Sequence, residues 1–403
     1  MDRRQKQVVS IALITAFALI GDSMLYIVLP VYWKEIGLSS IWEVGLLLSI
    51  NRFIRIPLAP VVWWLYRYIP MKTGVLIAIL IASVTTILYG MSGFWLLLIC
   101  RCAWGLAWTL LRMSGMRVLA EMDVGSQGHL TGLYNGLYRL GSLFGMLFGG
   151  ILASLIGFQS MTLVFGLLTL MGCIFYVSLN EIEKREGTQV YHGIKQKWFT
   201  RDVVKVLITG MLIALIIQGL FASTLSHVIE AKIDQDELTL FGFVIGASAL
   251  SGVIQALRWG WEPFLAPRTG KWFDRLVMKE RMLCWMFLSF GGLSFFVIML
   301  KVSGWFLLML LLIQLMATIV TTFTDTLAFQ KASAQTDKNR FLACYSFVQD
   351  MGAALGPLCG YTLIQFFGTN SVFWLMLIIS LMLVSMWIRS GQGSMFLLVQ
   401  CKK

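Results

Sequence analysis

The chain has 403 residues, of which 58% are hydrophobic and only 13% are charged, about half the charged fraction of soluble domains. Its mean hydropathy is +0.80, and its apolar runs repeatedly reach the roughly 20 residues that span a hydrocarbon core. These values exclude a soluble globular protein and predict an all-α polytopic membrane protein. The net charge of +12 does not indicate nucleic-acid binding, because the basic residues gather in short loops on one side of the predicted membrane.

Twelve apolar segments follow one another along the chain and predict twelve transmembrane helices. The basic head MDRRQKQ precedes the first segment, which we expect to stay as an anchor because no small-residue cleavage site follows it. The only long polar stretch separates the segments into two groups of six. The sequence thus predicts an N-terminal six-helix bundle over 1–180, a cytoplasmic linker over 181–202, and a C-terminal six-helix bundle with a short cytoplasmic tail over 203–403. The twelve segments cover about 8–32, 41–66, 71–92, 94–118, 128–156, 160–180, 203–228, 238–262, 283–300, 303–329, 340–366 and 370–390.

The distribution of basic residues predicts the orientation of these helices. The loops on one side hold only Lys34, Lys232 and Lys301, whereas the loops and termini on the other side hold most of the remaining lysines and arginines. Cytoplasmic loops carry such an excess of lysine and arginine. We therefore expect both termini and the linker to be cytoplasmic, in a bacterial-type cell membrane.

Several charged residues fall inside the apolar segments. Arg52 and Arg55 interrupt LLLSINRFIRIPLAPVVWWLY, and Asp22 lies at a similar depth in the first segment. One arginine at the bilayer centre costs roughly 2.5–3.5 kcal/mol, so such residues normally face a partner or a wet cavity. These residues and their polar neighbours are the candidates for substrate binding: Asn51, Arg52, Arg55, Arg101, Tyr134 and Arg139.

Two interpretations of this polar set remain open. In the structural one, Asp22 neutralises one arginine while asparagine and tyrosine side chains satisfy the others. In the functional one, the arginines exceed the available acids and await an anionic group on a substrate. Trp104 and Trp108 are expected to anchor at the membrane interface, and the alternative is that they line a cavity beside Arg101.

Two carboxylates are candidates for proton coupling. Asp350 has no basic partner within its own helix, and a buried carboxylate without a partner favours its protonated form. Asp22 is expected to bind or release its proton as substrate charge arrives or departs. Arg258 and Glu262, four residues apart, are expected to form a local ion pair instead.

Glycines recur at helical spacing in two corresponding segments. In the fifth segment, Gly141, Gly145 and Gly149 are four residues apart, and the eleventh segment carries Gly352, Gly356 and Pro357. Such stripes allow another helix to approach closely, and their paired positions are typical of an internal repeat. The alternative interpretation is generic helix packing.

The sequence GKWFDR, with Gly270, Asp274 and Arg275, is predicted to lie in the loop between segments eight and nine. It is similar to a loop motif of the major facilitator superfamily, which the sequence resembles across essentially its whole length. The glycine stripe from Gly141 looks like the fifth-helix motif of drug/proton antiporters, although Met146 occupies the usual proline position. Arg101 with Gly105 and Pro30 with Tyr32 add to the resemblance, whereas the loop between segments two and three lacks the expected glycine and aspartate.

The resemblance implies two pseudo-symmetric bundles that rock around a central site, with gating roles for the loop motif and the glycine stripes. We therefore expect a secondary active transporter that exports a small amphiphilic or anionic molecule in exchange for protons. The alternative is an uptake carrier or flippase for an anionic solute or lipid. The expected partners are a small-molecule substrate, protons and membrane lipids, and the protein is expected to be a monomer.

Other classes of protein fit the sequence less well. A membrane-embedded transferase needs acids and histidines clustered at one interface, but the loops are short and His129, His192 and His227 are far apart. A non-transporting sensor is expected to carry a signalling domain or a longer tail. The seven cysteines lie mostly inside apolar segments and are interpreted as small buried hydrophobes. We therefore expect no enzymatic activity, no metal site and no cofactor.

Overall fold

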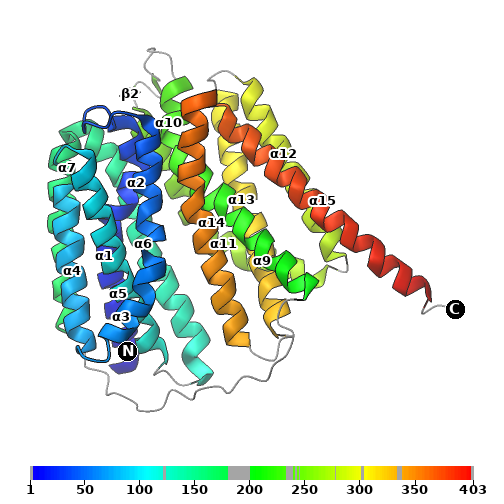
Figure 1. Ribbon diagram of the computed structural model, residues 1–403, viewed down its shortest axis with the longest axis horizontal. Helices are drawn as coiled ribbons and strands as arrows, with labels where there is room; N and C mark the ends of the chain where they lie inside the picture. Colours follow the sequence, from blue (N-terminus) through cyan, green and yellow to red (C-terminus); the bar gives the residue numbers. More distant parts are fainter. Residues whose placement is uncertain are drawn as a thin grey trace. The chain divides into compact units, whose positions relative to one another are not determined.

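The computed structural model describes residues 3–120, 124–179, 200–232, 239–240, 243–244, 246–276, 278–300, 304–333 and 338–400. Long helices dominate these residues, as Figure 1 shows. The exception is a pair of short antiparallel strands of two residues each, β1 (Thr239–Leu240) and β2 (Phe243–Val244). Most of the linker predicted over 181–202 lies outside the described residues.

The chain divides into two compact units. The first unit comprises Met1–Ser39, Leu46–Trp198 and Ser248–Ala256, and the second comprises Ser40–Gly45, Phe199–Ala247 and Leu257–Lys403. The helices of the N-terminal half are α1 (Arg3–Tyr32), α2 (Ile41–Phe53), α3 (Arg55–Leu65), α4 (Met71–Leu88), α5 (Phe94–Ala120), α6 (Val124–Ile156), α7 (Phe158–Leu170) and α8 (Gly172–Tyr176). Those of the C-terminal half are α9 (Arg201–Ile213), the π-helix η1 (Ala214–Phe221), α10 (Ala222–Lys232), α11 (Ala247–Arg275), α12 (Lys279–Met299), α13 (Gly304–Ser333), α14 (Lys338–Phe367) and α15 (Ser371–Gln400).

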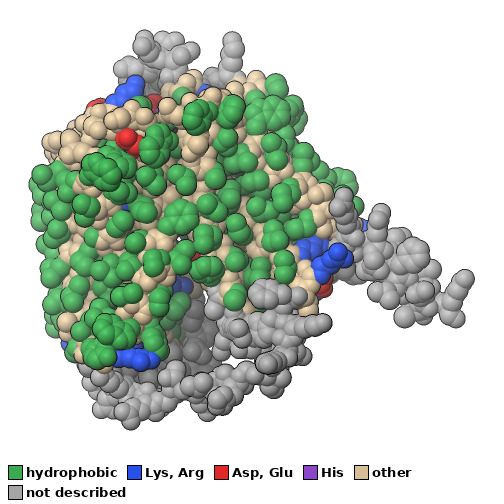
Figure 2. All heavy atoms as spheres, in the orientation of Figure 1, with side chains coloured by type: hydrophobic (Ala, Val, Ile, Leu, Met, Phe, Trp, Pro, Cys, Tyr) green, Lys and Arg blue, Asp and Glu red, His purple; other side chains and the backbone are tan. Residues whose placement is uncertain are grey.

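The structure confirms the all-α membrane fold with twelve spans, if α2–α3, α7–α8 and α9–η1–α10 each count as one span. Within the described residues, ten helical stretches are long and apolar enough to cross a membrane. The helices α11 and α14 are of similar length but are not among these ten stretches. On the face drawn in Figure 2, hydrophobic side chains cover the middle of the helices, and most charged side chains lie near the helix ends. This distribution fits a multi-pass membrane protein, whose apolar belt faces lipid.

The glycine stripe of α6 packs against α1 inside the first unit. A Cβ atom added to Gly145 would lie 3.0 Å from the Cα of Ile20 and closer still to its carbonyl oxygen. Gly141 meets the backbone of Ala16 in the same way, one helical turn away. Only residues without a side chain allow this approach, so the predicted close packing is confirmed.

The second unit repeats this arrangement with α14 and the helix that starts at α9. A Cβ atom on Gly352 would lie 2.9 Å from the carbonyl carbon of Met211, and Gly356 meets Gly219 backbone to backbone. The fifth span, α6, and the eleventh span, α14, therefore use glycine in the same way. The partner helices differ, because α1 is a regular α-helix whereas Gly219 lies in the π-helix η1.

Candidate functional site

A buried ion pair joins Asp22 of α1 to Arg101 of α5. The Arg101 side chain is 1% exposed, and its Nε atom also donates a 2.9 Å hydrogen bond to the backbone carbonyl of Leu47. Charges removed from water are tolerated when they meet an opposite charge and their remaining polar atoms are hydrogen-bonded. Asp22 thus neutralises one arginine from within its own unit, as the structural interpretation of the sequence expects.

Asn51 of α2 extends this ion pair into a longer chain of contacts. Its Nδ2 atom donates a 2.8 Å hydrogen bond to Asp22, and its Oδ1 atom accepts a 3.0 Å hydrogen bond from Arg55. The Asn51 side chain is fully buried, whereas Arg55 is partly exposed. The polar chain Arg55–Asn51–Asp22–Arg101 therefore runs from an accessible guanidinium to a buried carboxylate. Hydrogen bonds in such a chain polarise one another, so a change at one end affects the other.

A break between α2 and α3 positions the accessible arginines. Pro57 has no N–H to donate to the carbonyl of Phe53, four residues earlier, and its ring crowds that carbonyl. Accordingly α2 ends at Phe53 and α3 begins at Arg55, with Ile54 between them at φ −65° and ψ −24°. The backbone stays close to helical, so the break is local. Arg52 and Arg55 lie on either side of it.

Aromatic side chains surround both arginines. The guanidinium carbon of Arg52 lies 5.8 Å from the ring centre of Tyr26, and that of Arg55 lies 5.6 Å from Trp104 and 5.0 Å from Trp108. These distances fall within the range of cation–π attraction. Trp104 is fully buried, so the prediction that it anchors at the membrane interface is wrong.

The aromatic contacts continue from α5 to α6. Trp104 and Trp108 stack at 6.0 Å, Trp108 meets Tyr138 edge-on at 5.9 Å, and Tyr138 contacts Tyr134 at 5.2 Å. Arg112 lies 5.9 Å from the ring of Tyr134 and 5.8 Å from that of Tyr138. We call this set the aromatic ladder, and it consists of Trp104, Trp108, Tyr134 and Tyr138 with Arg55 and Arg112 at its ends.

The residues that the sequence indicates for substrate binding fall into two groups. Asn51, Arg101 and Tyr134 are buried in the first unit, and the polar chain contains two of them. Arg52 and Arg55 are partly exposed, and Arg139 is exposed on α6. Arg112, at the far end of the ladder, was missing from the sequence-based set. No spacing within α5 indicates its role, because its aromatic partners, Tyr134 and Tyr138, come from α6.

Two acids of the C-terminal half, Asp325 and Asp350, occupy different environments. Asp325 of α13 accepts hydrogen bonds from the Tyr345 hydroxyl at 2.7 Å and the Gln349 amide at 3.0 Å, both on α14. Asp350 is exposed on α14, so the expectation that it is a buried carboxylate is wrong. The sequence does not single out Asp325 as a coupling residue. Tyr345 and Gln349 are four residues apart and therefore share one face of α14, and this spacing was the available sign that both could donate to the same acceptor.

The GKWFDR motif lies in a helix. The prediction of a loop over 270–275 is wrong, because α11 continues to Arg275. Phe273 is fully buried and packs against Phe323 at 4.5 Å, which stabilises these last turns on α13. Arg275 is exposed, and Gly270 has no crowded neighbour. The side chain of Asp274 is outside those that the structure describes.

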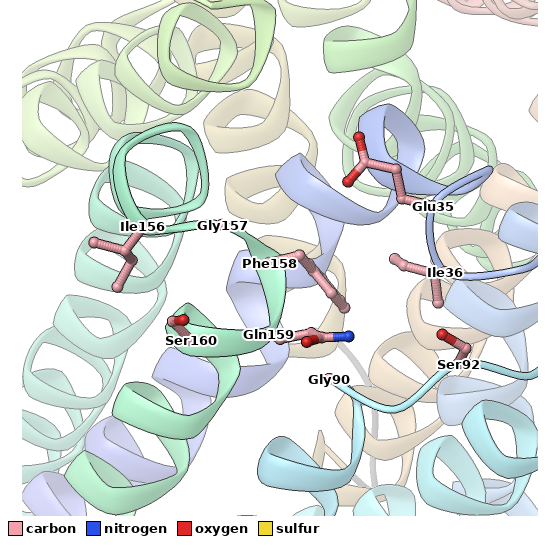
Figure 3. A pocket seen from close by; sticks show the side chains of 9 residues that line it. All are labelled: Glu35, Ile36, Gly90, Ser92, Ile156, Gly157, Phe158, Gln159 and Ser160. Atoms are coloured by element: carbon pink, nitrogen blue, oxygen red, sulfur yellow. The ribbon is translucent and has the colours of Figure 1, made fainter.

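The first unit also has a polar pocket of about 270 Å³ at the helix ends. The turn after α1, the α4–α5 loop and the α6–α7 junction form it together. Figure 3 shows the Gln159 side chain extending toward the Gly90–Ser92 turn, with Glu35 on the neighbouring loop. A carboxylate, an amide and hydroxyl groups suit a neutral or cationic ligand more than an anion, so this pocket differs in character from the arginine-bearing surface. A second, apolar cavity of about 450 Å³ lies between α1, α6 and α7 beside Gly141.

Comparison with known proteins identifies the class. The sequence profile described as Major Facilitator Superfamily matches residues 11–336, which is more than half of the chain. The chain belongs to the Major Facilitator Superfamily. Proteins of this family are membrane transporters and not enzymes, which confirms the predicted family and the prediction of a non-enzymatic protein.

Individual relatives are distant. The chain is 23% identical to the Staphyloferrin B transporter of Staphylococcus aureus (strain NCTC 8325 / PS 47) over 262 residues, which span 60% of this chain and 62% of that protein. It is 24% identical to the Multidrug resistance protein MdtG of Proteus mirabilis (strain HI4320) over 373 residues, 88% of each chain.

Solved structures show the same fold at low sequence identity. A crystal structure of the nucleoside transporter NupG matches with a TM-score of 0.69 and 14% identity, covering 96% of this chain and 98% of that one. A bacterial homolog to the human lysosomal transporter Spinster matches with a TM-score of 0.74 and 13% identity, covering 96% of each. Tetrameric PepTSo2 matches with a TM-score of 0.72 and 13% identity, covering 98% of this chain and 99% of that one.

Proposed function

We propose that the protein is a proton-coupled secondary transporter that exports a small amphiphilic or anionic molecule across the cell membrane by alternating access. Family membership supports the transporter class, and the relatives it matches include a Staphyloferrin B transporter and a Multidrug resistance protein. The basic loops support cytoplasmic termini.

The polar chain Arg55–Asn51–Asp22–Arg101 is the observation that carries this proposal. Arg55 is an accessible positive charge, and Asp22 is a buried carboxylate that holds Arg101. A substrate group that engages Arg55 withdraws it from Asn51, and Asn51 in turn is hydrogen-bonded to Asp22. Substrate binding and proton binding therefore act on one connected set of side chains.

The second candidate function, uptake or flipping of an anion, is supported by the charge balance of the same chain. When Asp22 takes up a proton, Arg101 loses its counter-charge. An anionic substrate that enters with the proton restores the neutrality of the network, so proton and anion travel in the same direction. The direction of proton flux relative to solute flux separates the two functions.

Reconstitution into vesicles with an imposed pH gradient tests the proposal. Anionic, neutral amphiphilic and cationic solutes are screened while a trapped dye records internal pH. Export coupling predicts opposite movement of solute and protons, and the Asp22→Asn variant is expected to lose the proton movement. Parallel movement of an anion and protons would replace the proposal by its alternative. Absence of flux for every solute, with intact and oriented protein, would refute transport.

A further inference from the structure

The aromatic ladder presents part of its length to the surface of the first unit. Arg55, Trp108, Tyr138 and Arg112 are partly exposed, whereas Trp104 and Tyr134 behind them are buried. The exposed part thus has a guanidinium at each end and an indole and a phenol ring between them. A surface of this composition presents an indole ring, a phenol ring and two positive charges to the same ligand.

Two glycines of α5 hold the ladder in place. A Cβ atom on Gly105 would lie 2.9 Å from the carbonyl oxygen of Asn51, so this glycine brings α2 against α5 where Arg55 reaches the indoles. A Cβ atom on Gly115 would overlap the ring of Tyr134, so that glycine seats the tyrosine of α6 on α5. The Tyr134 ring is therefore held against the backbone of α5, and α2 lies against α5 near Arg55. Fixed rings lose little conformational entropy when a ligand stacks on them.

The charges of the ladder decide which ligands it accepts. Two guanidinium groups in a weakly polar environment repel a cation more strongly than they would in water. An anionic group gains a charge-assisted hydrogen bond from a guanidinium edge, and that bond is compatible with the same guanidinium lying over an indole face. The buried indole N–H of Trp104 has no hydrogen-bond partner in the described part of the chain. No carboxylate belongs to the ladder itself.

We propose that the aromatic ladder is the surface that selects the substrate, and that it selects a planar aromatic ring carrying an anionic group. This inference rests on the proposed transport function and narrows its substrate class. Stacking on Trp108 and Tyr138 discriminates flat rings from saturated ones. Arg112 and Arg55 discriminate anions from cations.

Binding to the purified, detergent-solubilised protein tests the selection without any gradient. Three matched radiolabelled probes are compared: 2-naphthoate, its saturated analogue decahydro-2-naphthoate, and the cation 2-naphthylmethylammonium. We expect 2-naphthoate to bind about 3- to 10-fold more tightly than the saturated anion, which corresponds to one aromatic stacking contact. The cation is expected to bind more weakly than either anion.

Two variants and two matched controls assign the selection to the ladder. Trp108→Leu is expected to remove the preference for the flat ring, and Arg112→Gln to weaken binding of both anions about 10- to 100-fold. Trp95→Leu and Arg117→Gln, on the same helix but outside the ladder, are expected to leave both preferences unchanged. Because each variant is compared across three probes, a general loss of folding lowers all signals together and is recognised.

The outcomes distinguish a failure of the proposed substrate selection from a failure of the proposed transport function. If the wild-type protein binds the three probes equally, or if Trp108→Leu keeps the full preference for 2-naphthoate, the inference is overturned even when another solute is transported in vesicles. If 2-naphthoate binds with the expected pattern but no solute crosses the membrane under a pH gradient, the ladder is a binding surface and the proposed transport function fails.

Discussion

Asp22 and Arg101, from the first and fourth spans, form an ion pair that is almost completely removed from solvent. The pair connects α1 to α5, and Asn51 and the Leu47 carbonyl add hydrogen bonds from α2. In such a site each partner is tolerated because of the other. Breaking a buried pair by removing one partner is far more costly than removing both.

The first prediction follows from this dependence. Arg101→Gln is expected to lower the free energy of unfolding by about 3–5 kcal/mol, because the Asp22 carboxylate stays buried without its counter-charge. The double variant Asp22→Asn/Arg101→Gln is expected to recover part of that loss. Unfolding titrations of the wild type, Asp22→Asn, Arg101→Gln and the double variant in mixed detergent measure the coupling. Strictly additive effects of the two substitutions would contradict a direct pair.

The second prediction concerns the glycine stripe of α6. Gly145→Ala places a methyl group against the backbone of Ile20 and is expected to destabilise the protein by about 1–3 kcal/mol. Gly136→Ala on the same helix is the control, since a Cβ atom there meets nothing within 4 Å. That control is expected to be neutral or to stabilise by up to about 1 kcal/mol through helix propensity. Thermal unfolding in detergent compares them, and equal effects would argue against close packing of α1 and α6.

The third prediction tests the hydrogen bonds of Asp325. Tyr345→Phe removes the hydroxyl that donates to this carboxylate at 2.7 Å and is expected to cost about 1.5–3 kcal/mol of stability. Tyr68→Phe is the matched control, because Tyr68 is 67% exposed, and we expect it to change stability by less than about 0.5 kcal/mol. The same detergent titrations provide the measurement. A Tyr345→Phe variant as stable as the wild type would show that Asp325 does not depend on this donor.

The fourth prediction concerns the arginines beside the break between α2 and α3. The double variant Arg52→Gln/Arg55→Gln is expected to abolish transport of anionic solutes and to spare any cationic solute that the wild type moves, since only anions need the guanidinium groups. Arg67→Gln, near the end of the same span, serves as the control and is expected to retain anion flux. Initial rates of solute flux in vesicles decide the matter. Equal loss for anions and cations would indicate a structural role.

Hydrophobic segment length predicted the number of spans and most of their bounds, because the bilayer sets a minimum length that an apolar run must reach. The local breaks were harder to predict. Pro57 explains the interruption after Phe53 once the structure shows where the helix ends, but Pro30 and Pro357 lie inside continuous helices. The GKWFDR motif continued α11 instead of forming a loop, because burial of Phe273 outweighs the polar composition of its neighbours.

The site was predictable only in part, because contacts between helices depend on the rotation of each helix about its axis. The sequence indicated that Asp22 meets an arginine, and the structure identifies Arg101 as that arginine. The contact of Asn51 with Arg55 fits their spacing of four residues, which the local break between α2 and α3 preserves. The ladder partners Trp108 and Tyr138 come from different helices, so no spacing rule connects them.

The wide-turn segment η1 has a consequence for how the two repeats behave. Eight residues wound with five-residue hydrogen-bonded rings take up more chain per unit length than an α-helix, and such geometry is rare because it is less favourable. The residues Ala214–Phe221 therefore span less distance along the helix axis than eight residues of an α-helix would. One of them, Gly219, makes the glycine contact with α14. Rewinding to ordinary turns would lengthen that span and rotate everything beyond it, from Ala222 to Lys232. The helix α1 is a regular α-helix without such a segment, so only the second half can change the length of a span at its glycine contact in this way.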